Sequence, residues 1–350
     1  MFRWWVQLKF WRHDLQLTNA WAIAGGAAKH VHPVLFVQLT DAADTTGLGE
    51  SAPSRQYRET VETAQKFLEQ VDARRLSFGE VAGSVEYLNA LAPGEFSAKS
   101  ALNVALLDGA AKLAKLPLHQ FLGLNFRDQN HVTSFSIGID RPTKIGEKVL
   151  AAAEFPVLKL KVGSTHDREN LAALRAAAPK KLVRVDANGA WTTKESALEK
   201  IEWLASDEHI EFVEQPMPTN ASAADLRWLK ARSPLPLFAD ESFHFADDAA
   251  VCAEGFHGVN VKLHKTGGVT AAVAALRAAR SCGLKTMLGC MIESSVLISA
   301  AAHLAELTDF LDLDGNLLVT NDPYRGVTAE RGILSFAAAK ERCGLCVTAR

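Results

Sequence analysis

The chain has 350 residues, of which 48% are hydrophobic and 22% are charged, and its net charge at pH 7 is -2. This is enough apolar material for the core of one large domain or two. Because no run of five or six like charges occurs, the sequence excludes a charged face for nucleic acid or for a membrane surface, and we expect a small-molecule substrate in a pocket. The N-terminus is interrupted by charge too early for a signal peptide, and no apolar run reaches membrane-spanning length, so we expect a cytoplasmic protein.

The five cysteines are scattered and odd in number, which favours reduced thiols in the cytoplasm over a disulfide framework. Cys343 and Cys346 have CxxC spacing. A zinc site would need a second pair of ligands, and a redox motif would stand at the start of a helix after a strand. The sequence contains neither signal, and we assign this pair no function.

Residues 1–125 are predicted to form a separate α+β domain in which strands precede helices. Loose alternation over 2–17 and a clearer strand at 33–40 lead to a turn-rich segment at 47–53, which indicates an antiparallel unit. Three helical patterns follow, at 58–71, 78–91 and 97–116. The third has small and apolar residues on all sides, which is typical of a buried helix.

Residues 126–320 change to short apolar runs that alternate with helical patterns. The candidate strands are 134–139, 157–162, 182–186, 211–214, 235–240, 259–263, 286–289 and 310–313. Eight consecutive βα units predict a closed (β/α)-barrel with an N-terminal α+β capping domain; a doubly wound open sheet is the alternative. Residues 321–350 are too irregular for another unit, and we expect them to pack back on the cap.

Three consecutive barrel strands are predicted to end in carboxylates, at Asp186, Glu214 and Asp240. Active sites of barrel enzymes lie where the strands end, and side chains of neighbouring strands converge there. Three anionic oxygens without Cys or His suit a hard cation that retains water, and we predict one magnesium ion. Single acids at strand ends often only cap helices, but three in register favour the metal site. Asn188 and Glu241 lie beside these ligands in the sequence, and we expect them to contact the ligands without binding the metal themselves.

Lysines flank the predicted metal site. Lys159 and Lys161 alternate with leucines on the second strand, so both point into the barrel mouth. Lys262 ends the sixth strand, which lies opposite the second in a ring of eight. One amine on each face of a bound substrate would suit proton transfer. A lysine base needs a lowered pKa, and we expect Lys159 and the metal to lower the pKa of Lys161 by charge repulsion.

Five motifs carry a resemblance to a known family: KLK at 159–161, VDANGAW at 185–191, FVEQP at 212–216, ADES at 239–242 and VKLHKTGG at 261–268. With them the chain resembles the muconate-lactonising branch of the enolase superfamily over essentially its whole length. Enzymes of this superfamily use a Lys or His base with magnesium. The resemblance implies that Asp186, Glu214 and Asp240 ligate Mg²⁺, with Lys161 and Lys262 as the acid/base pair and Lys159 as an electrostatic helper.

A DxD motif on the predicted eighth strand, Asp312 and Asp314, is too far from the three ligands to bind the metal. Together with GCMIESS at 289–295 it resembles the dipeptide epimerases. In these the DxD holds the N-terminal ammonium, and the C-terminal residue is inverted at its α-carbon. The alternative is that both acids only cap the following loop. Further predicted substrate contacts come from the first strand, the early loop and the segment after the seventh strand, namely Ser136, Trp21, Met291 and Ile292.

The side chain of the second substrate residue is predicted from the early loop. Ala-Glu epimerases of this family carry an arginine there that meets the substrate glutamate, whereas the ungapped alignment places Ala22 at that position. Trp21 and Ile23 would suit an apolar second residue better, although Arg55 or Lys29 could reach in instead.

Other functions share part of this machinery. An o-succinylbenzoate-synthase-like lyase, an N-acylamino-acid racemase or a muconate cycloisomerase would use the same lysines and metal but would not need the DxD. A non-catalytic ligand-binding barrel is disfavoured, because the two lysines and three carboxylates are all present. We expect a homo-oligomer, as is common for barrels of this family.

Overall fold

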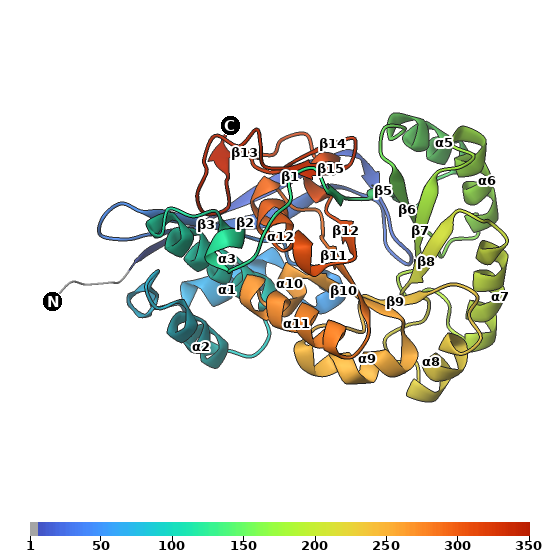
Figure 1. Cartoon of the computed structure of the whole chain (residues 1–350), viewed down its shortest axis with the longest axis horizontal. Coiled ribbons are helices and arrows are strands. Elements are labelled where there is room, and N and C mark those ends of the chain that lie inside the picture. The colour runs from blue at the N-terminus through green and yellow to red at the C-terminus, as the bar shows by residue number, and fades with distance from the viewer. Residues whose placement is uncertain (1–5) are drawn as a thin grey trace.

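The computed structural model describes residues 6–350, so residues 2–5 of the first predicted strand lie outside it. An antiparallel sheet of order β1-β2-β3 begins the chain. Its strands are β1 (Gln7–Trp21), β2 (Lys29–Thr40) and β3 (Thr46–Ser51). Together with the helices that follow, up to residue 121, it forms a unit at one end of the molecule, which we call the cap (Figure 1).

The cap helices pack on this sheet. They are η1 (Arg55–Tyr57), α1 (Val61–Glu69), η2 (Ala73–Arg75), α2 (Val81–Leu91), α3 (Phe96–Leu113) and α4 (Leu118–Phe121). Helix α3 is buried along most of its length. It lies so close to β3 that a Cβ on Gly47 would stand 2.0 Å from the Ala105 carbonyl oxygen, and one on Gly49 would stand 1.9 Å from that of Ala101. Glycine is therefore required at both positions.

Eight parallel strands form the second part of the molecule, in the order β12-β11-β10-β9-β8-β7-β6-β5. They are β5 (Phe135–Ile137), β6 (Val157–Lys161), β7 (Leu182–Asp186), β8 (Ile210–Glu214), β9 (Leu237–Ala239), β10 (Gly258–Lys262), β11 (Lys285–Gly289) and β12 (Phe310–Asp312). The ring closes just before β5, where Thr133 bridges Leu311 in parallel and the Ser134 N–H donates to the Leu311 carbonyl at 3.1 Å. The closed barrel is confirmed, and the open sheet is wrong.

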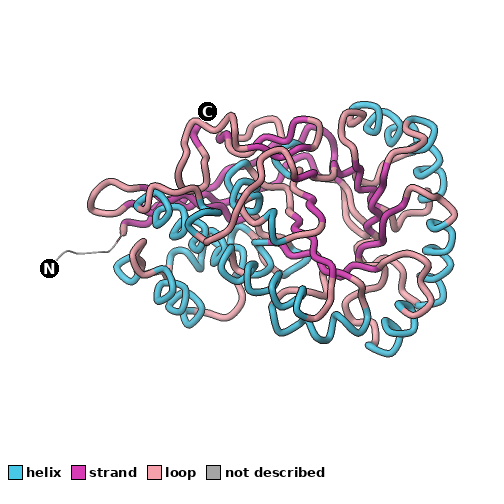
Figure 2. The backbone as a smooth tube through the Cα atoms, in the orientation of Figure 1, coloured by secondary structure: helices cyan, strands magenta, loops and turns pink. Residues whose placement is uncertain are grey.

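Helices surround these strands, as Figure 2 shows most clearly along the outer rim. They are α5 (Pro142–Ala151), α6 (Asp167–Ala177), α7 (Lys194–Ala205), α8 (Ala223–Lys230), η3 (Ala246–Asp248), α9 (Ala249–Gly255), α10 (Leu263–Thr266), α11 (Val269–Ser281), α12 (Ser295–Ala302), η4 (Ala305–Leu307) and η5 (Gly315–Leu318). Within residues 6–350, no helix has both the length and the hydrophobicity to cross a bilayer.

An aromatic layer fills the barrel below the carboxyl ends of its strands. Phe212 and Phe238 stack with ring centroids 4.2 Å apart, and Phe310 meets both edge-on. The Arg184 guanidinium lies 5.0 Å from the Phe310 ring and donates to Glu211 and to the Leu311 carbonyl. This packed layer forms a floor, so a substrate must bind above it, on the side of the cap.

The C-terminal segment contacts both parts of the molecule. Its short strands are β13 (Tyr324–Arg325), β14 (Thr328–Glu330), β15 (Ile333–Ser335) and β16 (Thr348–Ala349), and β15 pairs with β4 (His131–Val132). Asn321 accepts a hydrogen bond from the Gln16 N–H in β1, and the Leu345 N–H donates to Asp108 in α3. In Figure 1 the red C-terminal strands lie beside β1 accordingly.

A buried carboxylate joins the cap to the barrel. Glu50, on β3, accepts hydrogen bonds from the Ser294 N–H at 2.8 Å and the Ser294 hydroxyl at 2.6 Å, and from the Leu297 N–H at 3.3 Å. It thereby satisfies donors at the first turn of α12, where an anion is favoured. Burial nevertheless raises the pKa of Glu50 to about 7.

This raised pKa predicts a pH-dependent stability. The folded chain binds the Glu50 proton more tightly than the unfolded chain, so the free energy of unfolding should fall as pH rises from about 4.5 to about 7 and then level off. The contribution of this one group is about 3 kcal/mol. Urea unfolding at pH 5 and pH 8 should show a smaller difference for Glu50→Gln than for the unmutated protein. Glu199→Gln, on the exposed side of α7, is the control, and an equal difference in all three proteins would contradict the assignment.

Candidate active site

Three carboxylates converge at the carboxyl ends of adjacent barrel strands. Asp186 ends β7, Glu214 ends β8, and Asp240 directly follows β9. All three side chains are completely buried, and one carboxylate oxygen from each lies within 4.8 Å of the others. The structure thus brings together the three acids that the sequence placed in register.

The donor set of this cluster fits a hard divalent cation. Asn260, on β10, donates to Glu214 Oε1 at 2.8 Å and so orients that carboxylate. Lys159 Nζ lies 2.7 Å from Glu214 Oε2 without the angles of a hydrogen bond, and no other group in residues 6–350 bonds to that oxygen. Three buried carboxylates with a free lone pair among them are the ligands that Mg²⁺ prefers.

Lysine ammonium groups neutralise the cluster from both sides of the barrel. From β6, Lys161 Nζ lies 2.6 Å from Asp186, and from β10, Lys262 Nζ lies 2.7 Å from Asp240. The lysine deeper in the barrel, Lys159, contacts Asp186 at 3.1 Å as well as Glu214. The structure therefore places the two predicted acid/base lysines on opposite sides of the three carboxylates.

Attraction between carboxylates and ammonium groups competes with burial and repulsion in the electrostatics of the cluster. Burial opposes the charge on Lys262, but attraction to Asp240 outweighs it and raises the pKa of Lys262 well above its usual value. Although burial also opposes the charge of Asp186, its attraction to Lys161 and Lys159 lowers its pKa to about 2. For Glu214, burial and repulsion from Asp186 raise the pKa to about 8. In this arrangement carboxylate–ammonium attraction dominates at Lys262 and Asp186.

The two acids of the DxD motif have different partners. Asp312 pairs with Lys159 at 2.8 Å and accepts a hydrogen bond from the Ser134 hydroxyl at 2.7 Å. Asp314 accepts one from the Ser136 N–H at 2.6 Å, but in the described part of the chain no lysine or arginine pairs with it. Burial and the neighbouring Asp312 raise the pKa of Asp314 to about 7. A buried carboxylate without a countercharge is suited to bind a cationic group.

A pocket between the cap and the barrel, which we call the substrate chamber, contains these groups. The predicted residues that line it are Trp21, Ile23, Ser136, Lys159, Lys161, Asn188, Lys262, Met291, Ile292, Asp312 and Asp314. Lys29 and Arg55 also line the chamber, whereas Ala22 only contributes a carbonyl that accepts the Ile139 N–H. The cap wall of the chamber is therefore partly apolar and partly cationic.

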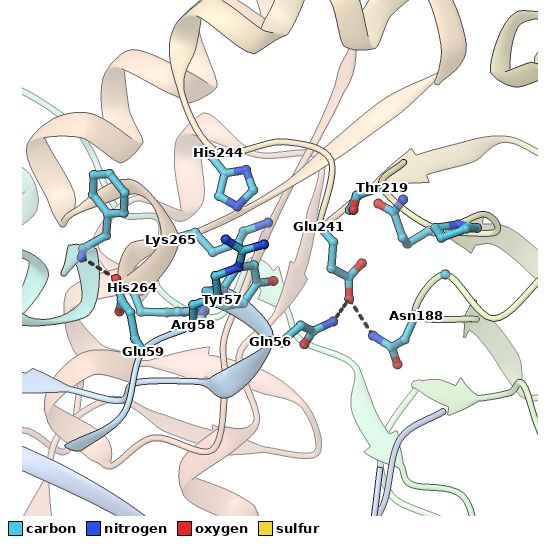
Figure 3. A pocket seen from close by; sticks show the side chains of 14 residues that line it. Gln56, Tyr57, Arg58, Glu59, Asn188, Thr219, Glu241, His244, His264 and Lys265 are labelled. Carbon is cyan, nitrogen blue, oxygen red and sulfur yellow. Dashed lines mark hydrogen bonds between the residues drawn. The ribbon is translucent and has the colours of Figure 1, made fainter. Parts of the chain in front are cut away.

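Several residues of the site were missed from the sequence. Asn260 could have been found, because it alternates with Lys262 on β10 and so points to the same side. Lys265, in the short helix α10, is fully buried and bonds to Asp240 Oδ1 at 2.6 Å. Gln56, from η1 of the cap, donates to Glu241, which also accepts from Asn188 (Figure 3). Lys265 lies within the motif at 261–268, but no role was predicted for it, and no sequence pattern pointed to Gln56.

Comparison with known proteins agrees with this geometry. The family model described as "Enolase C-terminal domain-like" matches residues 144–328. The L-Ala-D/L-amino acid epimerase of Pedosphaera parvula is 60% identical over 347 residues, which cover 99% of this chain and 100% of that protein. The chain belongs to the enolase superfamily.

Solved structures of the enolase superfamily show the same architecture. A dipeptide epimerase from Enterococcus faecalis, crystallised with Mg and the dipeptide L-Leu-L-Tyr, is 28% identical, with a TM-score of 0.88 over 98% of this chain and 99% of that chain. A dipeptide epimerase from Cytophaga hutchinsonii, crystallised with Mg and D-Ala-L-Val, is 27% identical, with a TM-score of 0.90 over 99% of this chain and 96% of that one. The resemblance seen in the motifs is thereby confirmed.

The buried position of Lys159 predicts a large loss of stability when its charge is removed. Lys159→Met leaves the Asp312, Glu214 and Asp186 carboxylates short of one countercharge, and breaking a buried ion pair in this way costs about 3–5 kcal/mol. Urea unfolding should show this loss. Lys194→Met is the matched control, because the Lys194–Asp225 pair on the surface is screened by water and its loss should matter far less. Similar losses in both variants would contradict the role of Lys159 as a buried countercharge.

Proposed function

We propose that this protein is a dipeptide epimerase that inverts the α-carbon of the C-terminal residue of an L,L-dipeptide. The observation that carries the proposal is the combination, in one chamber, of opposed lysines that contact a buried carboxylate cluster and an acid free to bind an ammonium. The 60% identity to the L-Ala-D/L-amino acid epimerase of Pedosphaera parvula supports it. Incubating a dipeptide library in deuterated water and following α-proton exchange would test the activity directly.

The three carboxylates are proposed to hold one magnesium ion, in agreement with the magnesium in the related crystal structures. When bound, the ion would stabilise the negative charge that develops on a substrate carboxylate when the adjacent carbon loses its proton. Asn260 orients Glu214, and Asn188 bonds to Asp186 through its backbone N–H at 2.9 Å. These contacts fix the ligand oxygens before substrate binds.

Lys161 and Lys262 are proposed to exchange protons with opposite faces of the α-carbon. As a neutral amine, one lysine takes the α-proton and its C–H electron pair stays on the substrate; the other, as an ammonium, donates a proton to the opposite face. The configuration is then inverted, and the two lysines have exchanged protonation states. Lys159 is proposed to act as a fixed countercharge beneath them.

The N-terminal ammonium of the dipeptide is proposed to bind Asp314, with Asp312 held beside it by Lys159. Ser136 aligns the Asp314 carboxylate through its backbone N–H. A lyase acting on a succinylbenzoate precursor, a muconate cycloisomerase or an N-acylamino-acid racemase would not use this contact. The presence of Asp314 without a countercharge therefore favours the epimerase over these alternatives.

The second residue of the dipeptide is proposed to be apolar, in contact with Trp21, Ile23, Met291 and Ile292. Lys29 and Arg55 line the same chamber, and their positive charges also suit an acidic side chain. A homo-oligomeric assembly and a cytoplasmic location stay predictions.

Removing either acid/base lysine should abolish epimerisation, because inversion needs an acid on the face opposite the base. For Lys161→Ala and for Lys262→Ala we expect the rate to fall by 10²- to 10⁴-fold or more, roughly what general acid–base catalysis contributes. Each variant should still exchange the α-proton of one epimer with deuterated water, which proton NMR can follow. Lys144→Ala, on the exposed side of α5, is the control. A variant of Lys161 or Lys262 that epimerises at the rate of the unmutated enzyme would rule out the two-base mechanism.

Losing Asp314 should weaken recognition of the substrate ammonium. A hydrogen bond to a charged group is worth about 1.5–3 kcal/mol, so Asp314→Asn should reduce kcat/KM for dipeptides by roughly 10- to 150-fold. An N-acetylated dipeptide, which has no ammonium, should be a comparably poor substrate of the unmutated enzyme. For that substrate, Asp314→Asn should lower kcat/KM much less.

The same carboxyl group predicts a pH dependence. Only deprotonated Asp314 attracts an ammonium, so kcat/KM for dipeptides should rise as pH increases through about 7. Asp314→Asn should remove this rise. If dipeptides and their N-acetyl forms react equally well, the DxD motif is structural, and an N-acylamino-acid racemase or an o-succinylbenzoate synthase becomes the better assignment.

A further inference from the structure

A second cavity lies next to the substrate chamber, and we call it the outer chamber. Its volume is about 490 Å³, against about 190 Å³ for the substrate chamber. Gln56 and Asn188 line both cavities, and Glu241 lines the outer one. These three side chains therefore form the wall between the two chambers, and Figure 3 shows the Glu241 carboxylate between the two amides.

Hydrogen bonds hold this wall together across the gap between cap and barrel. Gln56 Nε2 donates to Glu241 Oε1 at 2.5 Å, and Asn188 Nδ2 donates to the same oxygen at 3.0 Å. Through the Asn188 N–H, which donates to Asp186 Oδ1 at 2.9 Å, the chain of contacts continues to the carboxylate cluster. A cap residue is thus connected to a proposed magnesium ligand through two barrel residues.

The cap side of the wall is placed by a tight turn. Gln56 lies in η1, where the Tyr57 N–H donates to the Ser54 carbonyl at 2.9 Å and the Arg58 N–H donates to the Arg55 carbonyl at 3.0 Å. Arg58 then leaves the turn with a φ of 62°, in the left-handed region. The Tyr57 ring packs edge-on against His244, with centroids 5.7 Å apart. The turn is therefore anchored on both sides of Gln56, and the amide side chain is aimed at Glu241.

Glu241 needs such donors because its surroundings disfavour the negative charge of its carboxylate. Its carboxylate is buried beside those of Asp240 and Asp186, and like charges at short range repel one another. Its second oxygen, Oε2, has no hydrogen-bond partner in the described chain. Within residues 6–350, the two amides on one oxygen are therefore the only hydrogen-bond donors that hold this carboxylate.

We propose that Gln56 is a positioning residue for the epimerisation: it holds Glu241 against Asn188 and so closes the substrate chamber on the side of the carboxylate cluster. This inference rests on the proposed function. Without the Gln56 amide, the carboxylate turns towards the outer chamber, the two cavities join, and water reaches the bound dipeptide. Substrate binding then weakens more than the proton transfer does, because the lysines and the carboxylate cluster keep their own contacts.

The test replaces Gln56 with methionine, which keeps the volume of the side chain and removes the donor. Gln56→Met should raise KM for a good dipeptide substrate by roughly tenfold or more, the size expected for a hydrogen bond to a charged group. It should leave kcat within about threefold and the unfolding midpoint unchanged. The matched control is Gln65→Met, which removes a glutamine–glutamate hydrogen bond of 2.9 Å from the exposed side of α1 in the same cap. It should leave KM unchanged.

A double-mutant cycle identifies Glu241 as the partner. In a Glu241→Ala background, adding Gln56→Met should change KM little further, because the contact is already lost. If Gln56→Met changes KM equally in both backgrounds, if it leaves KM at the value of the unmutated enzyme, or if it lowers kcat and the unfolding midpoint together, the positioning role is wrong.

Hydrogen exchange measured by mass spectrometry separates this proposal from the epimerase assignment. In Gln56→Met, amides of residues 54–59 should exchange faster than in the unmutated protein and in Gln65→Met. If the unmutated protein epimerises no dipeptide, the proposed function fails, yet faster exchange still supports the closed wall. If exchange at residues 54–59 is unchanged in Gln56→Met, the proposed role of Gln56 in holding the wall is wrong, whether or not the protein epimerises dipeptides.

Discussion

The structure depends on holding like charges together in the interior of the barrel. Three carboxylates cannot share one buried site unless cations or hydrogen-bond donors offset their repulsion. Within residues 6–350, four lysines contact the cluster: Lys159, Lys161, Lys262 and Lys265. The first three line the substrate chamber, whereas Lys265 lines the outer chamber. The same type of side chain thus offsets the buried negative charge and, in the proposed mechanism, transfers protons.

Much of this arrangement could be predicted from the sequence because it follows from periodicity. Short apolar runs between helical patterns located all eight barrel strands within a few residues, and the spacing of one βα unit brought Asp186, Glu214 and Asp240 into register. Alternation along the second strand pointed Lys159 and Lys161 into the barrel, where both line the substrate chamber. These features are set by the geometry of one strand or by the repeat of the barrel, and both can be read from local patterns.

The remaining contacts join segments that no local pattern relates. Gln56 meets Glu241 because a turn of the cap docks on the barrel, and the two residues are 185 positions apart. The pairing of Asp312 with Lys159 links the last strand of the ring, β12, to the second, β6, so it depends on barrel closure rather than on either strand.

The contact between Glu50 and the first turn of α12 has a consequence for how such enzymes diversify. Helix α12 begins directly after the segment that supplies Met291 and Ile292 to the chamber, so a cap strand fixes one end of a barrel loop that faces the substrate. A cap transplanted from a relative onto this barrel would have to bring an acid at the position of Glu50, or that loop would lose its anchor. Cap and barrel are therefore coupled at this contact, and an exchange of one without the other should disturb the loop that carries Met291 and Ile292.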